Sequence, residues 1–331
     1  MENFNNKVAI VTGATGLIGS NLVHALLTYG AKVIAIGRNK AKLDNTFDDD
    51  TNLIKLEHDI VHEKLSQYWN IDYVFHAASP ISGYEIKNHP VDVINANMDG
   101  LLNCIDYLER QKKRTNKNGR LIIFSSATVY GIAKDCDLIV SEDDTKKCED
   151  IKSPIAAYAE SKRMIEVMAG AYKKQLDIDY IVARIGYVYG YSKYLPQTAF
   201  YEFIKKAVKG EDISINNPTM PRRDNIYIDD VVNGLLCISQ KGISGEAYNI
   251  SSGGMYNNFS AIDEMTKIII EVVQEIKGEC LSNLYIKESV EERLSGIMMN
   301  NDKLKILGWN LKYSMRDGIL ETVKRYCKNN E

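Results

Sequence analysis

The sequence lacks any clustering of metal-binding or disulfide-forming residues. Its six cysteines are scattered along 331 residues without a C-x-x-C pair, so no disulfide framework is indicated and a reducing compartment is expected. His58 and His62 stand close in sequence, but "LIKLEHDI" alternates as a strand does and no third ligand is near. We therefore predict no metal site.

A large charge of one sign and long apolar runs are also missing. Lys and Arg number 41 and Asp and Glu 44, a net charge of -3, so no basic field attracts nucleic acid or anionic lipid. No apolar run approaches the ~20 residues that span a bilayer, and the polar residues 1–6 carry no targeting pattern. The expectation is a cytoplasmic protein with neither a nucleic-acid nor a membrane partner.

Short apolar, β-branched runs alternate with helix-like segments through the first half of the chain. The runs include "KVAIVTG", "AKVIAIG", "DYVFHAA" and "RLIIFSS". This alternation is typical of βαβ units that form a parallel sheet covered on both faces. We predict a Rossmann-type, doubly wound α/β domain from residues 1–185 and about 225–250, with a smaller substrate-binding lobe from residues 186–224 and 251–331.

A glycine-rich turn joins the first predicted strand to the first predicted helix. In "VAIVTGATGLIGS", Gly13 permits the tight turn, Gly16 lets the backbone approach a pyrophosphate, and Gly19 lets helix and strand pack closely. The helix N-terminus then offers amide donors to the anion. The predicted dinucleotide contacts in this turn are Gly13, Thr15, Gly16, Leu17, Ile18 and Gly19.

The ends of the next strands supply further predicted cofactor contacts. Gly37 and Arg38 follow "VIAI" at the place where an NAD-selective site carries a carboxylate. Arg38 can pair with the 2′-phosphate of NADP, so we predict NADP rather than NAD. The alternative is that Arg38 is an ordinary exposed arginine. Asp59 is expected to accept a hydrogen bond from the adenine amino group. The other contacts predicted at strand ends are Ile60, Ala77, Ala78, Ser79 and Ile185.

A tyrosine and a lysine one helical turn apart are the candidate catalytic pair. The pKa of tyrosine, ~10 in water, must fall before the hydroxyl can exchange protons near neutrality. A nearby ammonium and a cationic nicotinamide both stabilise the phenolate. The spacing Y-x-x-x-K occurs at Tyr130/Lys134, Tyr158/Lys162, Tyr189/Lys193 and Tyr201/Lys205, so spacing alone does not identify the pair.

Helical signals favour Tyr158 and Lys162. Ser153 and Pro154 form a plausible cap and first turn before the amphipathic "IAAYAESKRMIEVM", which places the pair on one helix face. Ser126, at the end of the preceding strand, is expected to bond both the tyrosine and a substrate oxygen. We therefore predict Ser126, Tyr158 and Lys162 as the catalytic residues.

The other three pairs lie in less suitable contexts. Tyr130 and Tyr189 are each followed directly by glycine in a predicted turn, where residues four apart need not meet. Tyr201 lies in the loosely patterned second half of the chain, remote in sequence from the glycine-rich turn.

With these motifs in place, the sequence resembles the nucleotide-sugar epimerase/dehydratase branch of the extended short-chain dehydrogenase/reductase family. The segments "TGATGLIG", "HAASP", "NANMDG", "SSATVYG", "YAESK", "RRDNIYIDDVV" and "LKILGW" follow the family's order nearly end to end. The resemblance implies an NAD(P)-dependent enzyme that acts on a nucleotide-diphosphate sugar.

The resemblance also implies roles for individual residues. Ser126 and Tyr158 are the expected acid/base pair, and Lys162 is expected to bind the nicotinamide ribose. Asn97 resembles the family's asparagine that supports the active-site helix and lies among the expected cofactor contacts. Arg223 and Arg293 resemble the arginines that grip the substrate diphosphate, for which a guanidinium fork is suited.

By the same resemblance, the protein is expected to form a homodimer. The helices near 91–113 and 154–175 would build a four-helix contact between two copies. Met164 and Met168 are candidate interface residues, with packing inside one subunit as the alternative.

Two departures from the family pattern concern the substrate. Ala127 and Thr128 stand where dehydratases and decarboxylases of the branch carry an acidic residue, which favours simple redox chemistry at one carbon. Tyr187 replaces an asparagine that contacts substrate phosphate in many members. The expected substrate contacts are Ser126, Thr128, Tyr187, Arg223 and Arg293.

Two enzyme reactions fit this pattern, and a third reading involves no reaction. The segment "SSATVYG" resembles that of the family's sugar 4-epimerases, in which a C4 hydroxyl is oxidised and then reduced from the other face. The apparent NADP preference instead favours a 4-keto-sugar reductase. We lean to the epimerase, and a dinucleotide-sensing protein without catalysis is the distant alternative.

Overall fold

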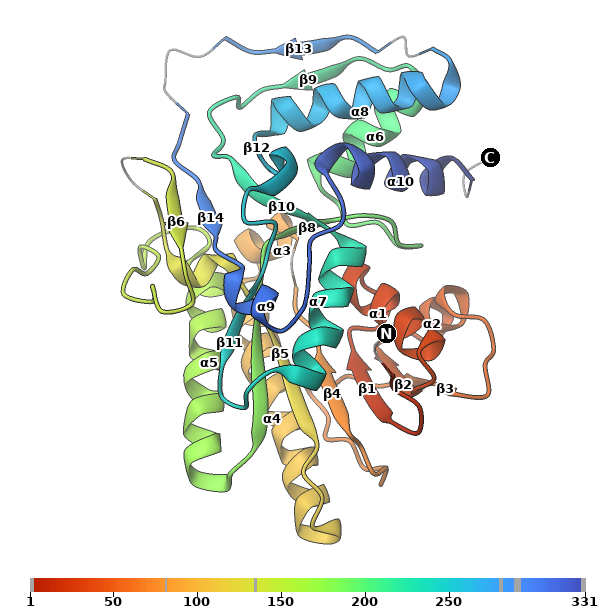
Figure 1. Cartoon of the computed structure of the whole chain (residues 1–331), viewed down its shortest axis with the longest axis vertical. Helices are drawn as coiled ribbons and strands as arrows, with labels where there is room; N and C mark the ends of the chain where they lie inside the picture. Colours follow the sequence, from red (N-terminus) through yellow and green to blue (C-terminus); the bar gives the residue numbers. More distant parts are fainter. Residues whose placement is uncertain (1–2, 81, 134–135, 280–281, 289–292, 329–331) are drawn as a thin grey trace.

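Seven parallel strands form the central sheet of the protein. The computed structural model describes residues 3–80, 82–133, 136–279, 282–288 and 293–328, which leaves Lys134 and Cys280 outside the described residues. The strands run in the order β3-β2-β1-β4-β5-β7-β11 (Figure 1). Their bounds are β1 Val8–Thr12, β2 Lys32–Gly37, β3 Leu53–Glu57, β4 Tyr73–His76, β5 Arg120–Ser126, β7 Asp179–Ile185 and β11 Ala247–Ile250.

Apolar side chains leave both faces of this sheet, which explains the continuous apolar runs. Along β1, Ala9 and Val11 join one buried cluster and Ile10 joins the other. Helices α1 (Leu17–Thr28) and α7 (Ile228–Lys241) cover the first face, and α4 (Pro90–Thr115) and α5 (Ala156–Leu176) cover the second. The predicted doubly wound Rossmann-type fold is confirmed.

Strand order reverses at β1, where the chain has placed β2 and β3 on one side and β4 on the other. In such sheets, ligands bind beyond the carboxyl ends of the strands at this reversal. The glycine-rich turn leaves β1 there, and Ser126 ends β5 at the same edge. The fold thus brings the predicted cofactor and catalytic segments together.

A second lobe lies beyond that edge and contains two smaller sheets. One has the order β12-β10-β14-β6 with β8 beside β10, and β13 pairs with β9. Figure 1 shows α8 and α10 beside these strands. The bounds are β6 Leu138–Val140, β8 Tyr187–Tyr189, α6 Ala199–Lys209, β9 Ile213–Ile215, β10 Arg223–Tyr227, β12 Phe259–Ser260, α8 Ile262–Lys277, β13 Leu284–Ile286, β14 Ile297–Met299 and α10 Met315–Lys328.

Short helices complete the connections: α2 (Lys40–Thr46), α3 (Gly83–Asn88), α9 (Asp302–Ile306), and the 3-10 turns η1 (Ala127–Tyr130) and η2 (Met255–Asn257). Strand β6 comes from within residues 1–185 yet pairs with β14 near the end of the chain. The sheet of the second lobe therefore includes a strand that comes from the predicted Rossmann segment.

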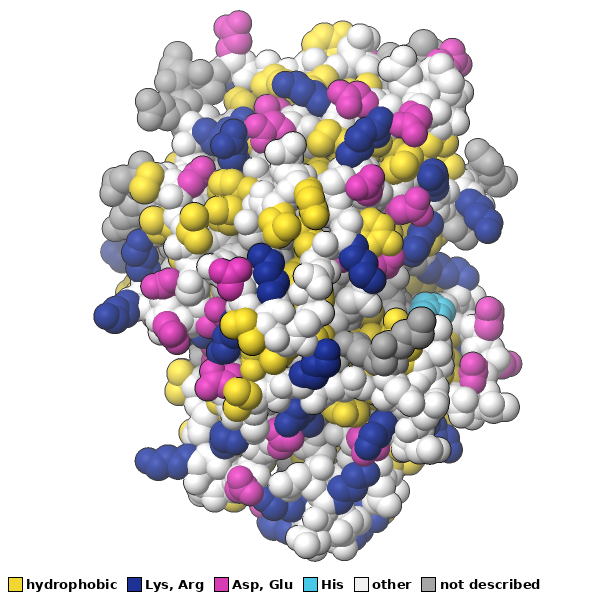
Figure 2. Space-filling model, in the orientation of Figure 1, with side chains coloured by type: hydrophobic (Ala, Val, Ile, Leu, Met, Phe, Trp, Pro, Cys, Tyr) yellow, Lys and Arg dark blue, Asp and Glu magenta, His cyan; other side chains and the backbone are white. Residues whose placement is uncertain are grey.

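The surface carries both signs of charge. Figure 2 shows Lys and Arg side chains intermixed with Asp and Glu over the face in view, as the small net charge of -3 predicts. No helix among the described residues is long and apolar enough to cross a membrane.

Candidate active site

The glycine-rich turn is shaped by two close backbone approaches. Gly13 has φ +62°, and a Cβ there would lie 2.9 Å from the Ala77 carbonyl oxygen. A Cβ on Gly19 would lie 2.3 Å from the Gly13 carbonyl oxygen. Gly16 occupies the N-cap of α1 and brings no side-chain acceptor to that helix end. These residues fit a dinucleotide phosphate, since the turn is tight and the helix N-terminus has no acceptor from its own cap.

A buried histidine fixes the loop that leaves β4 beside this turn. The Thr12 hydroxyl lies 3.0 Å from His76 Nδ1 and accepts a hydrogen bond from the Ala78 amide at 3.1 Å. Burial, together with the charge of Lys162, lowers the pKa of His76 to about 3, so the ring is neutral near neutrality. Thr12 and His76 therefore hold the predicted contacts Ala77 and Ala78 against the turn.

Asn97 links that loop to the helix that carries the candidate catalytic pair. Its Oδ1 accepts from the Ser79 hydroxyl at 2.7 Å, and its Nδ2 donates to the Ser161 hydroxyl at 2.8 Å. Ser161 in turn donates to the Tyr158 carbonyl oxygen at 3.0 Å. Because Asn97 is 1% exposed, these bonds form inside the protein and fix the start of α5.

Tyr158 and Lys162 share a face of α5, as their spacing predicts. Lys162 Nζ lies 5.7 Å from the centroid of the Tyr158 ring and donates to the Phe124 carbonyl oxygen at 2.8 Å. That bond ties the lysine to β5, two residues before Ser126. The structure therefore brings the three predicted catalytic residues together at the end of one strand.

The protonation of the pair is controlled chiefly by burial. Burial raises the pKa of Tyr158 above its ordinary value, although a hydrogen bond with Ser126 opposes this, and nearby Tyr187 raises the pKa further. Burial also lowers the pKa of Lys162 to about 7, against the charge of Glu166, which raises it. Without the charge of a cofactor, the Tyr158 hydroxyl therefore keeps its proton near pH 7.

The hydroxyls of the other three tyrosines bond inside the fold. Tyr201 donates to the Gly190 carbonyl oxygen at 2.9 Å, and Tyr189 to that of Met315 at 3.4 Å. Tyr130 donates to Asn249 Oδ1 at 2.5 Å. Among the four candidate tyrosines, these contacts favour Tyr158 over the other three.

At the adenosine end of the predicted cofactor site, Arg38 is exposed, and the Asp59 carboxylate contacts residues two and three positions later in the chain. The Asp59 carboxylate accepts from the Val61 amide at 3.0 Å and lies 3.1 Å from His62 Nδ1. Glu57, which the sequence did not single out, pairs in register with Gly37 and accepts from the Lys40 amide at 3.1 Å. The sequence places no carboxylate at the end of β2, but the structure places the Glu57 carboxylate of the neighbouring strand β3 beside Gly37.

The predicted substrate residues differ in their availability. Arg223 lies 4.6 Å above the Tyr187 ring and forms no ion pair with another described residue. Arg293 instead pairs with Asp263 at 2.7 Å. The Thr128 hydroxyl is buried without a hydrogen-bond partner in the described part of the chain.

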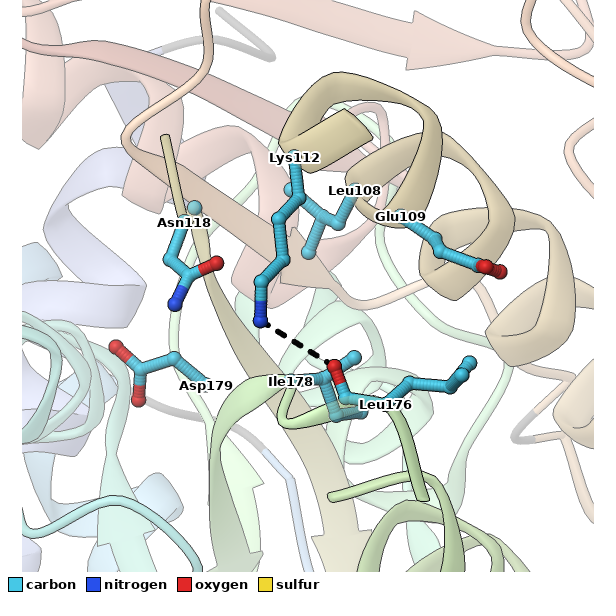
Figure 3. Close-up of a pocket in the computed structure, with 8 residues that line it drawn as sticks. Leu108, Glu109, Lys112, Asn118, Leu176, Ile178 and Asp179 are labelled. Atoms are coloured by element: carbon cyan, nitrogen blue, oxygen red, sulfur yellow. Dashed lines mark hydrogen bonds between the residues drawn. The ribbon is translucent and has the colours of Figure 1, made fainter. Parts of the chain in front are cut away.

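Two of the cavities lined by described residues lie outside this site. The first, of ≈ 10 Å³, lies where α4 meets the first residues of β7, at the opposite edge of the sheet, and Lys112 donates across it to the Leu176 carbonyl oxygen at 3.3 Å (Figure 3). It holds at most one water. The second, of ≈ 200 Å³, lies between α1, α7 and Tyr313.

In the described part of the chain, no group of three or more His, Cys, Asp or Glu side chains is arranged to hold a metal ion.

The sequence patterns did not single out several buried or half-buried polar residues of the site: Thr12, His76, Ser161, Glu166 and Arg184. A usable signal existed for Glu166, because it follows Lys162 by four residues and so shares its helix face. Thr12 and His76 lie 64 residues apart in the sequence, and Glu166 and Arg184 lie 18 residues apart. No local sequence pattern predicts contacts over such separations.

Known proteins share this architecture across most of the chain. UDP-glucuronic acid decarboxylase 1 of Danio rerio is 26% identical over 335 residues, which cover 99% of this chain and 74% of that protein. UDP-glucose 4-epimerase of Thermotoga maritima, solved with UDP-glucose, has a TM-score of 0.78 at 22% identity and covers 98% of this chain and 100% of its own. WbmF of Bordetella bronchiseptica, solved with NAD+ and UDP, has a TM-score of 0.76 at 23% identity, with 98% and 93% covered.

The family itself is established by a match that covers most of the chain. Residues 9–251 match the NAD dependent epimerase/dehydratase family, a span that runs from β1 to the residue after β11 and contains the glycine-rich turn, Ser126, Tyr158 and Lys162. The resemblance inferred from the motifs is confirmed, and this chain belongs to the NAD dependent epimerase/dehydratase family of enzymes.

Proposed function

We propose that the protein is a nucleotide-diphosphate-sugar 4-epimerase that uses a bound nicotinamide cofactor. The observation that carries the proposal is a Ser126, Tyr158 and Lys162 site whose neighbouring turn offers only neutral side chains, Ala127 and Thr128. Oxidation and reduction at one carbon need a single proton-transfer group.

Each residue has a separate task in this reaction. Tyr158 takes the proton from the sugar hydroxyl that is oxidised, and later returns it to the new alcohol. Ser126 bonds the same sugar oxygen and Tyr158. A bound oxidised nicotinamide supplies the hydride acceptor and a positive charge near the phenol. Lys162 stabilises the phenolate when it carries its proton.

Substrate recognition is assigned to residues of the second lobe. Arg223 stacks on Tyr187 and has no carboxylate partner among the described residues, so its guanidinium can pair with a diphosphate. Arg293 reaches a phosphate only if it leaves Asp263. Tyr187 and Thr128 would then contact the sugar or its phosphate, beside Tyr158.

The main alternative is an NADPH-dependent reductase of 4-keto sugars, and a dinucleotide-sensing protein without catalysis is the distant one. The exposed Arg38 favours the reductase through NADP, whereas Glu57 beside Gly37 opposes a 2′-phosphate. Intact Ser126, Tyr158 and Lys162 argue against the sensing protein.

The curated relative from Danio rerio is named for a decarboxylation. We expect no such activity here, because the Thr128 hydroxyl occupies the turn where an acid/base carboxylate is needed. Incubation with UDP-glucuronic acid should therefore release no carbon dioxide. Release of carbon dioxide at rates comparable to epimerisation would contradict the proposed reaction.

We also propose a cytoplasmic homodimer formed by α4 and α5. Met164 and Val167 on α5 are 45% and 66% exposed, which provides an apolar stripe for a second copy. Met168 is half-buried and packs against the buried cluster beneath α5, so Met164 is the more exposed of the two predicted methionines.

The reaction is tested by the fate of the cofactor. The purified protein is denatured to release its cofactor, and UDP-hexoses are then supplied to the intact protein while absorbance at the reduced-nicotinamide band is followed. An epimerase should hold oxidised cofactor and convert one hexose to its C4 isomer without net absorbance change. Stoichiometric consumption of NADPH by a 4-keto sugar would establish the reductase instead.

The role of Tyr158 is tested by Tyr158→Phe. This change removes the hydroxyl and keeps the ring above Lys162, so kcat should fall by about 10²- to 10⁴-fold while the protein still binds the sugar nucleotide. Tyr201→Phe is the matched control, because its hydroxyl bonds only the Gly190 carbonyl oxygen. Unchanged turnover in Tyr158→Phe would rule out this mechanism.

A further inference from the structure

A buried ion pair lies beneath the end of β5. Arg184 on β7 donates to the Glu166 carboxylate on α5, with Nη2 2.7 Å from Oε2 and Nε 3.1 Å from Oε1. Their side chains are 6% and 16% exposed. The Ser125 hydroxyl also donates to Glu166 Oε1, at 2.5 Å. The desolvation cost of a buried ion pair is offset only when its geometry is good and its remaining hydrogen bonds are satisfied in this way.

The pair is also bonded to segments outside α5 and β7. Arg184 Nη1 donates to the Tyr130 hydroxyl at 3.0 Å and to the Glu142 carbonyl oxygen at 2.6 Å. Tyr130 in turn donates to Asn249 on β11. These bonds fix the position of the Arg184 guanidinium. Because Arg184 lies on β7, it also fixes the Glu166 carboxylate relative to the sheet.

Both ends of this arrangement adjoin a candidate catalytic residue. Ser125 immediately precedes Ser126, and Glu166 follows Lys162 by one helical turn. The contact thus joins the strand end that carries Ser126 to the helix that carries Tyr158 and Lys162.

We propose that Glu166, fixed by Arg184 and Ser125, is a positioning residue that docks the Ser126 strand end on α5 and keeps Lys162 in its ammonium form. This inference rests on the proposed roles of Ser126, Tyr158 and Lys162. Glu166 itself touches neither substrate nor cofactor in this account.

The electrostatic part follows from the groups around Lys162. These are Tyr158 and Glu166 on its own helix, His76 on β4, and Arg184 on β7 through its pair with Glu166. Burial lowers the pKa of Lys162 to about 7 and the Glu166 charge opposes that fall. Removal of the Glu166 charge also leaves Arg184 unopposed, and both changes lower the pKa of Lys162 further.

The sign of the pH effect follows directly. The Lys162 ammonium is present below its pKa and is lost as pH rises through it. In Glu166→Gln the alkaline limb of the kcat profile should therefore move to lower pH, by about one unit. The KM for the sugar nucleotide should change little, because Glu166 does not contact it. The pH profile of NAD+ affinity should show the same displacement without any turnover.

Two further variants separate charge from packing. Glu160→Gln removes a carboxylate from the same helix that lies near Arg163 and accepts from the Glu149 amide, so its profile should match the wild type. Glu166→Gln with Arg184→Met removes both charges and should return the limb toward the wild-type pH. This double variant also serves if Glu166→Gln alone does not fold.

The outcomes distinguish this inference from the proposed reaction. A wild-type protein that turns over no sugar nucleotide contradicts the reaction, while the NAD+ affinity profile still tests Glu166. A limb that stays at the wild-type pH in Glu166→Gln, or that moves as far in Glu160→Gln, overturns the inference.

Discussion

At the scale of single residues, the neutral side chains next to Ser126 are the basis for proposing a reaction without elimination or decarboxylation. Ala127 and Thr128 begin the turn η1, and the Ser126 hydroxyl accepts from the Thr128 amide at 3.3 Å. The buried Thr128 hydroxyl has no partner among the described residues. A buried hydroxyl of this kind costs free energy unless a ligand bonds it, which supports the proposed contact of Thr128 with a sugar oxygen.

Cofactor choice is also decided by single residues. Arg38→Ala should lower NADP+ affinity about tenfold and leave NAD+ affinity nearly unchanged, because the lost contact is to the 2′-phosphate alone. Glu57→Gln keeps an acceptor for the Lys40 amide but removes a charge that repels the phosphate, so NADP+ affinity should rise. Fluorescence titration with NADH and NADPH measures both. An equal loss for both cofactors in Arg38→Ala would remove Arg38 as the selecting residue.

At the scale of elements, the site depends on how closely α4 approaches β4. Gly100 makes this approach possible, because a Cβ there would lie 2.9 Å from His76 Cε1. The His76 ring is held by Thr12 at 3.0 Å and cannot easily move away. Asn97, one turn earlier on α4, can then reach Ser79 and Ser161.

The packing of α4 is tested by a pair of glycine-to-alanine changes. Gly100→Ala should lower the free energy of unfolding by about 1–3 kcal/mol through overpacking against His76. Gly170→Ala on α5 is the control: its nearest neighbour, the Tyr180 hydroxyl, lies 3.6 Å away, so higher helix propensity should stabilise by up to about 1 kcal/mol. Urea unfolding measures both. Equal effects of the two changes would show that the α4 contact is not tight.

At the scale of the whole molecule, one sheet edge collects residues from distant parts of the chain. β1 contributes the glycine-rich turn, β5 contributes Ser126, and the second lobe places Arg223 and Tyr187 beyond them. Strand β6, which follows β5 along the chain, pairs with β14 within the second lobe. The proposed substrate therefore lies between the two lobes, with its reacting carbon at Tyr158.

The proposed dimer contact on α5 is also tested at the scale of the whole molecule. Val167→Glu places a charge in the exposed stripe of α5 and should convert a dimer into a monomer, since a charge buried in an apolar contact is costly. Sedimentation velocity measures the change. Ile306→Glu on α9, where Ile306 is 84% exposed, is the control and should leave the mass unchanged. A wild-type protein that sediments as a monomer would refute the dimer.

The amino-acid sequence by itself determined the sheet, the glycine-rich turn and the helix of the catalytic pair. These features depend on local periods: apolar β-branched runs form strands, and Tyr158 and Lys162 share a face because they are one turn apart. Gly13 and Gly19 were recognisable because only glycine tolerates the close approaches of that turn.

Only the tertiary structure decided which polar groups are already in use. It bonds the hydroxyls of Tyr130, Tyr189 and Tyr201 inside the fold, pairs Arg293 with Asp263, and places Glu166 on Arg184. Such contacts join residues from different elements, so no local pattern encodes them. The same burial raises the pKa of Tyr158 and lowers that of Lys162, because desolvation penalises a charge wherever the chain encloses it.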